Sequence, residues 1–89
     1  MKKISPNTFE ERVGYARHAN SIIYHDEIAW FANDDYSIYG TIIRDKIDND
    51  FSAVVLEKNK LNKYVATDQT TSLVSTEDAK KWLESKLNK

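Results

Sequence analysis

The chain has 89 residues, enough for one small domain, and 40% of them are hydrophobic, with one proline and two glycines. This composition is typical of a compact fold rather than of a disordered chain. The sequence contains no cysteine, which excludes disulfides and thiolate metal sites and fits a reducing, cytoplasmic environment. No segment reaches the roughly 20 apolar residues of a bilayer span, so we expect neither a membrane segment nor a signal peptide. The net charge of -1 argues against a nucleic-acid binder that relies on general cationic charge.

Residues 7–22 are predicted to form a helix. Asn7 is a suitable N-cap, and Glu10, three residues later, completes a pair with the spacing of a capping box. The apolar residues that recur at helical spacing and would face the core are Phe9, Val13, Ala16 and Ile23. Gly14 falls on the opposite side, where it would weaken the helix slightly.

The pattern between residues 28 and 67 changes to short segments rich in β-branched and aromatic residues, which is typical of strands. These segments are Ile28–Ala32, Ile38–Arg44, Phe51–Glu57 and Tyr64–Thr67. The polar breaks between them are short enough for hairpins. We therefore expect an antiparallel meander of three or four strands.

Residues 75–87 are predicted to form a second helix, with Ser75 as its N-cap and Val74 packed against Ala79 as a hydrophobic staple. The apolar stripe of this helix consists of Ala79, Trp82, Leu83 and Leu87. The expected fold is a single α+β domain over residues 1–89, with the element order α-β-β-β-β-α.

Both faces of the middle strands carry apolar side chains, for example Ile42 on one face and Ile43 on the other. Two arrangements are open. One helix could cover each face of the sheet, or both helices could cover one face. In the second case a homodimer or a partner protein would have to cover the remaining face.

The stretch RDKIDND, residues 44–50, places three aspartates and two basic residues between two apolar runs. In a meander it would share one end of the sheet with the start of the first strand, which gathers five carboxylates: Asp26, Glu27, Asp45, Asp48 and Asp50. This end could be a divalent-metal site, a contact surface for a basic partner, or a hairpin turn in which Asp and Asn bond the local backbone. Phe51 stands where a calcium loop needs glycine, so we expect no metal and no cofactor. The composition favours the turn.

Catalytic patterns are not recognisable in the sequence. The two histidines, His18 and His25, are expected at the solvated surface, and no G-x-S-x-G elbow or phosphate-binding glycine loop is present. Glu57 is followed two positions later by asparagine rather than lysine, so the carboxylate-x-lysine pattern of a restriction-type nuclease is incomplete. We therefore expect a protein that is not an enzyme.

The α-β-β-β-α arrangement that ends in AKKWLESKL resembles a double-stranded-RNA-binding domain. In that family the final helix begins with lysines that bind phosphates across the duplex groove. The residues at the matching positions here are Ser75, Thr76, Glu77 and Asp78. Negative charge at a helix start competes with phosphate for the helix dipole, so the resemblance implies shared architecture rather than shared function.

The stretch GTIIRDKIDNDFSAVVLEKNKLNKYVATD, followed by a capped helix, is similar to small accessory proteins encoded on phages and mobile elements. The similarity covers residues 40 to 87. It implies a short cytoplasmic protein that works by binding, such as an inhibitor of a host defence complex. An acidic edge would suit a protein that occupies a nucleic-acid groove.

The leading hypothesis is a non-enzymatic protein-interaction protein that binds another protein, such as a nucleic-acid-binding complex, and has no membrane partner. Its expected contacts are Asp26, Glu27, Asp45, Asp48 and Asp50, together with Tyr36 and Tyr39, which we expect to be exposed. The alternative is a nucleic-acid-binding module. It would use Lys58, Lys60, Lys63, Lys80 and Lys81.

Overall fold

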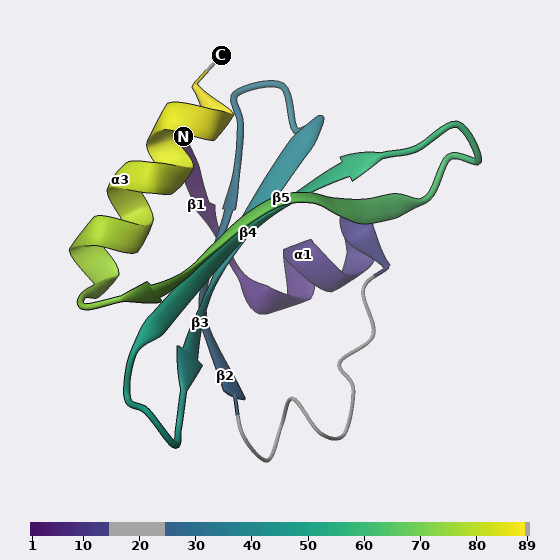
Figure 1. Ribbon diagram of the computed structural model, residues 1–89. Coiled ribbons are helices and arrows are strands. Elements are labelled where there is room, and N and C mark those ends of the chain that lie inside the picture. The colour runs from purple at the N-terminus through teal and green to yellow at the C-terminus, as the bar shows by residue number, and fades with distance from the viewer. Residues whose placement is uncertain (15–24, 89) are drawn as a thin grey trace.

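The computed structural model describes residues 1–14 and 25–88, which form a five-stranded sheet and two helices (Figure 1). The elements are β1 (Lys2–Ile4), α1 (Pro6–Val13), β2 (His25–Ala32), β3 (Ile38–Asp45), β4 (Phe51–Lys58), β5 (Tyr64–Leu73) and α3 (Thr76–Leu87). Each strand pairs antiparallel with the next one in the chain, so the spatial order is β1-β2-β3-β4-β5. The predicted α+β meander with an N-terminal and a C-terminal helix is confirmed, and the sheet has more than the expected three or four strands.

β1 is the strand that sequence patterns did not indicate. Its three residues pair with Trp30–Ala32 at the end of β2. A strand of this length, with two lysines, offers no apolar alternation to recognise. The element order therefore begins β-α rather than α.

The start of α1 differs from the prediction. The N-cap is Ser5, whose Oγ accepts a hydrogen bond of 3.1 Å from the backbone amide of Thr8. Pro6 occupies the first helical position. Proline is tolerated there because an amide at this position has no hydrogen-bond partner within the helix. The predicted cap at Asn7 is therefore wrong.

Gly14 ends α1 instead of lying within it. It adopts a left-handed conformation with φ of 66°, and its amide donates a hydrogen bond of 2.9 Å to the carbonyl of Glu10. Glycine is the usual residue at such a C-cap because it has no side chain to clash. The part of the predicted helix over residues 15–22 lies outside the described residues.

α3 begins and ends as predicted. The Oγ of Ser75 accepts a hydrogen bond of 3.2 Å from the amide of Asp78. Val74 is 84% exposed, so the predicted staple against Ala79 does not form. The buried residues of α3 are Ala79, Leu83 and Leu87, while Trp82 is half-buried at the edge of the stripe.

The two helices cover opposite faces of the sheet (Figure 1). α3 packs on a cluster that includes Phe31, Ile42, Ala53 and Val55. α1 contributes Phe9 and Val13 to a second cluster with Ala32, Tyr39 and Leu56. The structure thus has one helix on each face, so an uncovered second face no longer argues for a homodimer.

Candidate functional site

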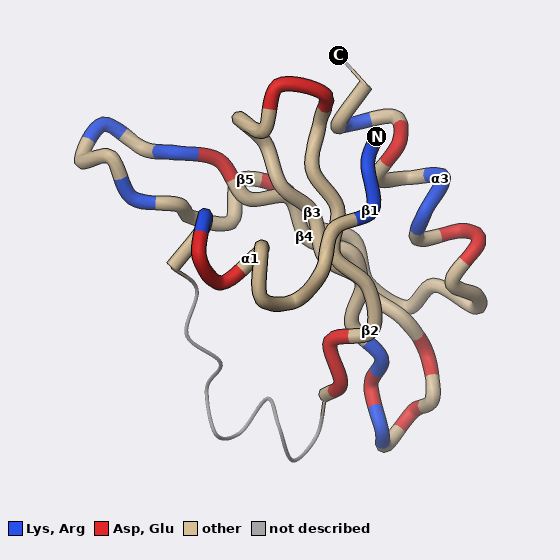
Figure 2. Tube along the Cα trace, turned by 180° about the vertical axis from the view of Figure 1, so that it is seen from behind, with Lys and Arg blue, Asp and Glu red and all other residues tan. Residues whose placement is uncertain are grey.

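The pairing of β2 with β3 brings the predicted carboxylates to one end of the sheet. His25 lies opposite Asp45 and Asp26 lies opposite Arg44, beside the turn that leads into β4. Figure 2 shows the start of β2 and this turn together at the end of the molecule far from the β2–β3 turn. We call residues 25–27 and 44–50 the hairpin end.

Asp26 is neutralised within the hairpin end. Its Oδ2 lies 2.9 Å from Arg44 Nη2, and its Oδ1 lies 3.2 Å from Lys46 Nζ. The ammonium of Lys46, together with the guanidinium of Arg44, holds the pKa of Asp26 below its ordinary value. Two cations therefore already compensate the charge of this residue.

Asp45 builds the turn. Its Oδ1 accepts hydrogen bonds from the amides of Asp48 at 3.1 Å and Ile47 at 2.8 Å, and these bonds lower the pKa of Asp45. Its other carboxylate oxygen lies 3.8 Å from His25 Nε2. The turn continues through Asn49, which has a left-handed φ of 56°. For Asp45, the geometry matches the local turn chemistry predicted from its residue type.

The remaining carboxylates of the hairpin end differ from one another. Glu27 accepts a hydrogen bond of 2.9 Å from Trp30 Nε1, which holds it against the sheet. Asp48 is exposed and Asp50 is partly exposed, and neither has an ion-pair partner in the part of the chain that the structure describes. Ile47 lies in the β3–β4 turn just before Asp48, and its side chain is 72% exposed. We call residues 46–50 the tip of the hairpin end. Our sequence reasoning missed Ile47, although an isoleucine in the middle of a polar turn was a visible signal.

The two tyrosines predicted at the contact surface do not join the hairpin end. Tyr39 is 1% exposed and packs edge-to-face on Phe9 and Tyr64, with ring centroids 6.3 Å and 5.4 Å away. The expectation that Tyr39 is exposed is therefore wrong, because its face of β3 lies under α1. Burial also raises the pKa of Tyr39.

Tyr36 is half-buried in the β2–β3 turn, at the opposite end of the sheet from the hairpin end. Its ring contacts two cations, with Lys2 Nζ 5.1 Å and Arg12 Cζ 4.7 Å from the ring centroid. These contacts tie the turn to β1 and α1. Tyr36 therefore belongs to a different surface from the predicted carboxylates.

The five predicted nucleic-acid contacts fall into two separate groups. Lys58, Lys60 and Lys63 lie on the β4–β5 hairpin, whereas Lys80 and Lys81 lie on α3, on the other side of the molecule (Figures 1 and 2). The first group gains Arg12 of α1, which lines a hollow of about 540 Å³ with Lys58, Lys63 and Tyr64. The two groups cannot act as one continuous cationic surface.

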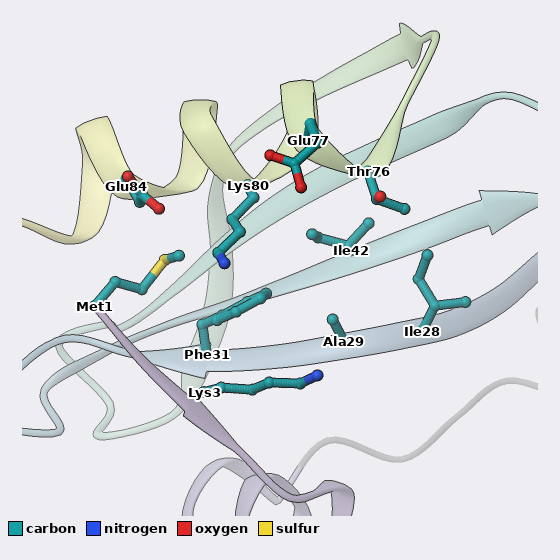
Figure 3. A pocket seen from close by; sticks show the side chains of 10 residues that line it. All are labelled: Met1, Lys3, Ile28, Ala29, Phe31, Ile42, Thr76, Glu77, Lys80 and Glu84. Carbon is teal, nitrogen blue, oxygen red and sulfur yellow. The ribbon is translucent and has the colours of Figure 1, made fainter.

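A second hollow of about 440 Å³ lies between α3 and the β1–β2 side of the sheet (Figure 3). Its floor is apolar, and its walls carry charged side chains from β1 and α3. The residues that define this α3 groove are Ile28, Phe31, Ile42, Lys3 and Lys80, with Glu77 and Glu84 on the helix. No sequence signal indicated the groove, because its walls come from opposite ends of the chain.

Within residues 1–14 and 25–88, no group of three or more His, Cys, Asp or Glu side chains is placed to hold a metal ion. None of the described helices combines the length and the apolar character that a membrane crossing requires. Comparison with known proteins found no matching family model, curated protein or solved structure. The candidate sites therefore rest on the chemistry of this chain alone.

Proposed function

We propose that this protein is a non-enzymatic interaction protein that docks the tip of its hairpin end on a basic partner protein. The observation that supports this is Ile47, 72% exposed, followed by two carboxylates without an ion-pair partner among the described residues. An apolar side chain beside carboxylates combines an anchor with charges that orient the partner.

The tip suits binding because it is ordered before contact. The carboxylate of Asp45 holds two backbone amides, and the Asp45 amide donates a bond of 2.9 Å to the carbonyl of Asp50. A tip of fixed shape loses little conformational entropy on association. Burial of an isoleucine side chain in a partner's pocket contributes about 1.5–3 kcal/mol.

The resemblance to phage and mobile-element accessory proteins extends the proposal to the kind of partner. A host defence complex that binds nucleic acid presents a positively charged groove. Asp48 and Asp50 would take the place of phosphates in such a groove, and Ile47 would contact its apolar wall. In this proposal the protein inhibits its partner by occupying the groove.

A random-peptide display library, selected on the immobilised full chain, tests the docking surface without knowledge of the partner. We expect the selected peptides to be rich in Lys and Arg, and to lose binding to Ile47→Ser and to Asp48→Lys. Leu61→Ser is the matched control, because Leu61 is 77% exposed at the tip of the other hairpin, between β4 and β5. Peptides without cationic residues, or equal loss with the Leu61 variant, would refute the proposal.

Nucleic-acid binding is the second candidate function. The hollow lined by Arg12, Lys58 and Lys63 around Tyr64 favours it, because cations beside an aromatic ring suit a single strand. Filter binding of a labelled single-stranded oligonucleotide across a salt series tests it. Affinity that falls steeply with salt and drops in Arg12→Gln would support this candidate, and no binding at low salt would eliminate it.

A further inference from the structure

The last turn of α1 lies beside the β4–β5 hairpin, on the face of the sheet opposite to α3 (Figures 1 and 2). Residues of both elements line the hollow of about 540 Å³ described above, which we call the basic hollow. Its volume falls within the range of small-molecule sites, roughly 300–1,000 Å³. The charged and aromatic residues that line it are Glu11, Arg12, Lys58, Lys63 and Tyr64.

Positive charge exceeds negative charge in the basic hollow. Three cationic side chains and one carboxylate line it, which leaves an excess of two positive charges. The C-terminal end of α1 adds a partial negative charge of roughly half a unit, so the excess stays positive. None of the three cations has an ion-pair partner within residues 1–14 and 25–88. The α3 groove, by contrast, carries two lysines and two glutamates, so its charge selects no ligand.

Arg12 is held in place by two tyrosines. Its Cζ lies 4.7 Å from the centroid of the Tyr36 ring. Its guanidinium also interacts with the hydroxyl of Tyr39, because burial raises the pKa of that hydroxyl and Arg12 opposes the rise. Arginine has five N–H donors in a planar fork, so donors remain for a ligand and little entropy is lost on binding.

The β4–β5 hairpin positions the two lysines. Asn59 Oδ1 accepts a hydrogen bond of 3.0 Å from the amide of Lys63, which orders the turn. Lys58 Nζ lies 5.5 Å from the centroid of the Tyr64 ring. That ring packs edge-to-face on Tyr39, the same residue that Arg12 contacts. The cations of the helix and of the hairpin are therefore positioned around one aromatic cluster.

A phosphate monoester matches the basic hollow better than a carboxylate does. It carries about 1.5 to 2 negative charges at pH 7 and three acceptor oxygens, which suit an excess of two positive charges on three cationic groups. A carboxylate has one charge and two oxygens. Tyr64 is half-buried, so part of its side chain stays exposed beside the cations. An aromatic ring at this place suits a ligand that carries a base.

We propose that the basic hollow binds a nucleotide through its terminal phosphate. The phosphate lies between Arg12, Lys58 and Lys63 and accepts hydrogen bonds from them, while the base lies against Tyr64. Two sources present this chemistry, a free nucleotide and the phosphorylated 5′ end of a single strand. The proposal rests on the second candidate function where the strand is the source, and it is separate from the docking proposed for the hairpin end.

Isothermal titration calorimetry with adenosine monophosphate, on the full chain in about 0.1 M salt to screen distant charges, measures this binding. We expect Arg12→Gln and Lys63→Gln each to weaken binding about tenfold, the effect of losing one charge-assisted hydrogen bond. Lys63 is exposed, so its variant keeps the test valid if Arg12→Gln loses stability with the Tyr36 contact. Lys3→Gln is the matched control. It removes the same charge from an exposed lysine beside α3 and should change affinity less than twofold.

Two analogues test the phosphate and the base separately. Adenosine, which lacks the phosphate, should bind at least tenfold more weakly than adenosine monophosphate. Ribose 5-phosphate, which lacks the base, should bind at least about fivefold more weakly, the effect of losing a base stacked on an aromatic ring. Equal affinity of either analogue, equal weakening in Lys3→Gln, or no saturable binding of the nucleotide would each overturn the proposal.

A short oligodeoxyadenylate, with and without a 5′ phosphate, separates the two sources. Binding of the phosphorylated strand at least as tight as that of the nucleotide, and tighter than that of the unphosphorylated strand, assigns the strand end. Binding of the nucleotide without binding of either strand assigns the free nucleotide and rejects the second candidate function. Equal affinity of the two strands without binding of the nucleotide would overturn the proposal and leave the second candidate function standing.

Discussion

Gly40 of β3 lies directly beneath Leu83 of α3. A Cβ atom added at position 40 would come within 2.7 Å of Leu83 Cδ2 and 3.2 Å of Leu87 Cδ1. Real Cβ atoms essentially never come within 2.7 Å of another carbon, so a side chain at position 40 would force the end of the Leu83 side chain to shift. The absence of a side chain at Gly40 therefore leaves room for Leu83 and Leu87 of α3 to pack closely on β3.

Gly40→Ala should destabilise the fold by about 1–3 kcal/mol, because the added methyl group overpacks the contact with Leu83. The entropy lost by the unfolded chain offsets a smaller part of this, about 0.4–1 kcal/mol. Urea denaturation followed by circular dichroism measures the change. In a Leu83→Ala background the same substitution should cost less, and additive costs would contradict the proposed clash.

The strands were predictable from the sequence where apolar and polar residues alternate or where short polar turns mark the strand ends. β2, β3 and β4 lie within a residue or a few of their predicted bounds, and Ser75 marks the start of α3 as expected. β5 extends to Leu73 through a polar and mostly exposed segment, residues 68–72, that carries no apolar alternation. The apolar pattern of the sequence thus located the buried strands β2, β3 and β4, but it did not locate the end of the exposed strand β5.

The candidate site was only partly predictable. Short polar breaks predicted that consecutive strands pair as antiparallel hairpins. This prediction placed Asp26 beside the β3–β4 turn, where the structure has it. Tyr39 was misplaced because alternation tells which residues share a face but not which face a helix covers. The α3 groove was invisible, since it depends on where residues 1–3 meet residues 76–84 in three dimensions.

Asp45 should make the stability of the fold depend on pH. Its pKa lies below the ordinary value of 3.8, because its carboxylate accepts bonds from the amides of Asp48 and Ile47. A lowered pKa contributes stability that is complete above the unfolded value and is lost as the pH falls through the folded value. Asp45→Asn keeps an acceptor but cannot titrate, so it should flatten the loss of stability below a pH of about 4.

Urea midpoints at neutral pH and at several points below pH 4 measure this difference. Asp48→Asn is the control, because the Asp45 carboxylate, not that of Asp48, accepts the turn bonds. Asp26 and Asp35 also have lowered pKa values, so a part of the acid sensitivity should persist in Asp45→Asn. An unchanged pH profile in Asp45→Asn would show that the turn bonds do not depend on its charge.

Leu83→Ala should be more destabilising than Trp82→Ala, although tryptophan is the larger residue. Leu83 is fully buried between α3 and the sheet, and truncation of such a residue costs about 2–5 kcal/mol. Trp82 is only half-buried at the margin of the core, and Lys86 Nζ lies 5.3 Å from the centroid of its ring. Denaturant titration of both variants gives the ranking, and the reverse order would mean that α3 is rotated from the orientation described.

β5 is an exposed edge of the sheet, ten residues long, and such an edge can pair with another chain. Asp68 lies near its middle. Its Oδ1 accepts a hydrogen bond of 2.9 Å from the amide of Gln69, and its Oδ2 lies 2.9 Å from Lys86 Nζ. The carboxylate thereby occupies a backbone donor and holds charge at the edge, two features that oppose strand addition.

Asp68→Val should therefore promote self-association through β5, because it removes this charge, releases the Gln69 amide and adds a β-branched residue. Size-exclusion chromatography with light scattering over a concentration series measures the mass of each variant. Asp34→Val is the control, since it makes the same change at an exposed position of the β2–β3 turn. If Asp68→Val keeps the mass of the unsubstituted chain at every concentration, the two bulges in the β4–β5 pairing are enough to protect this edge.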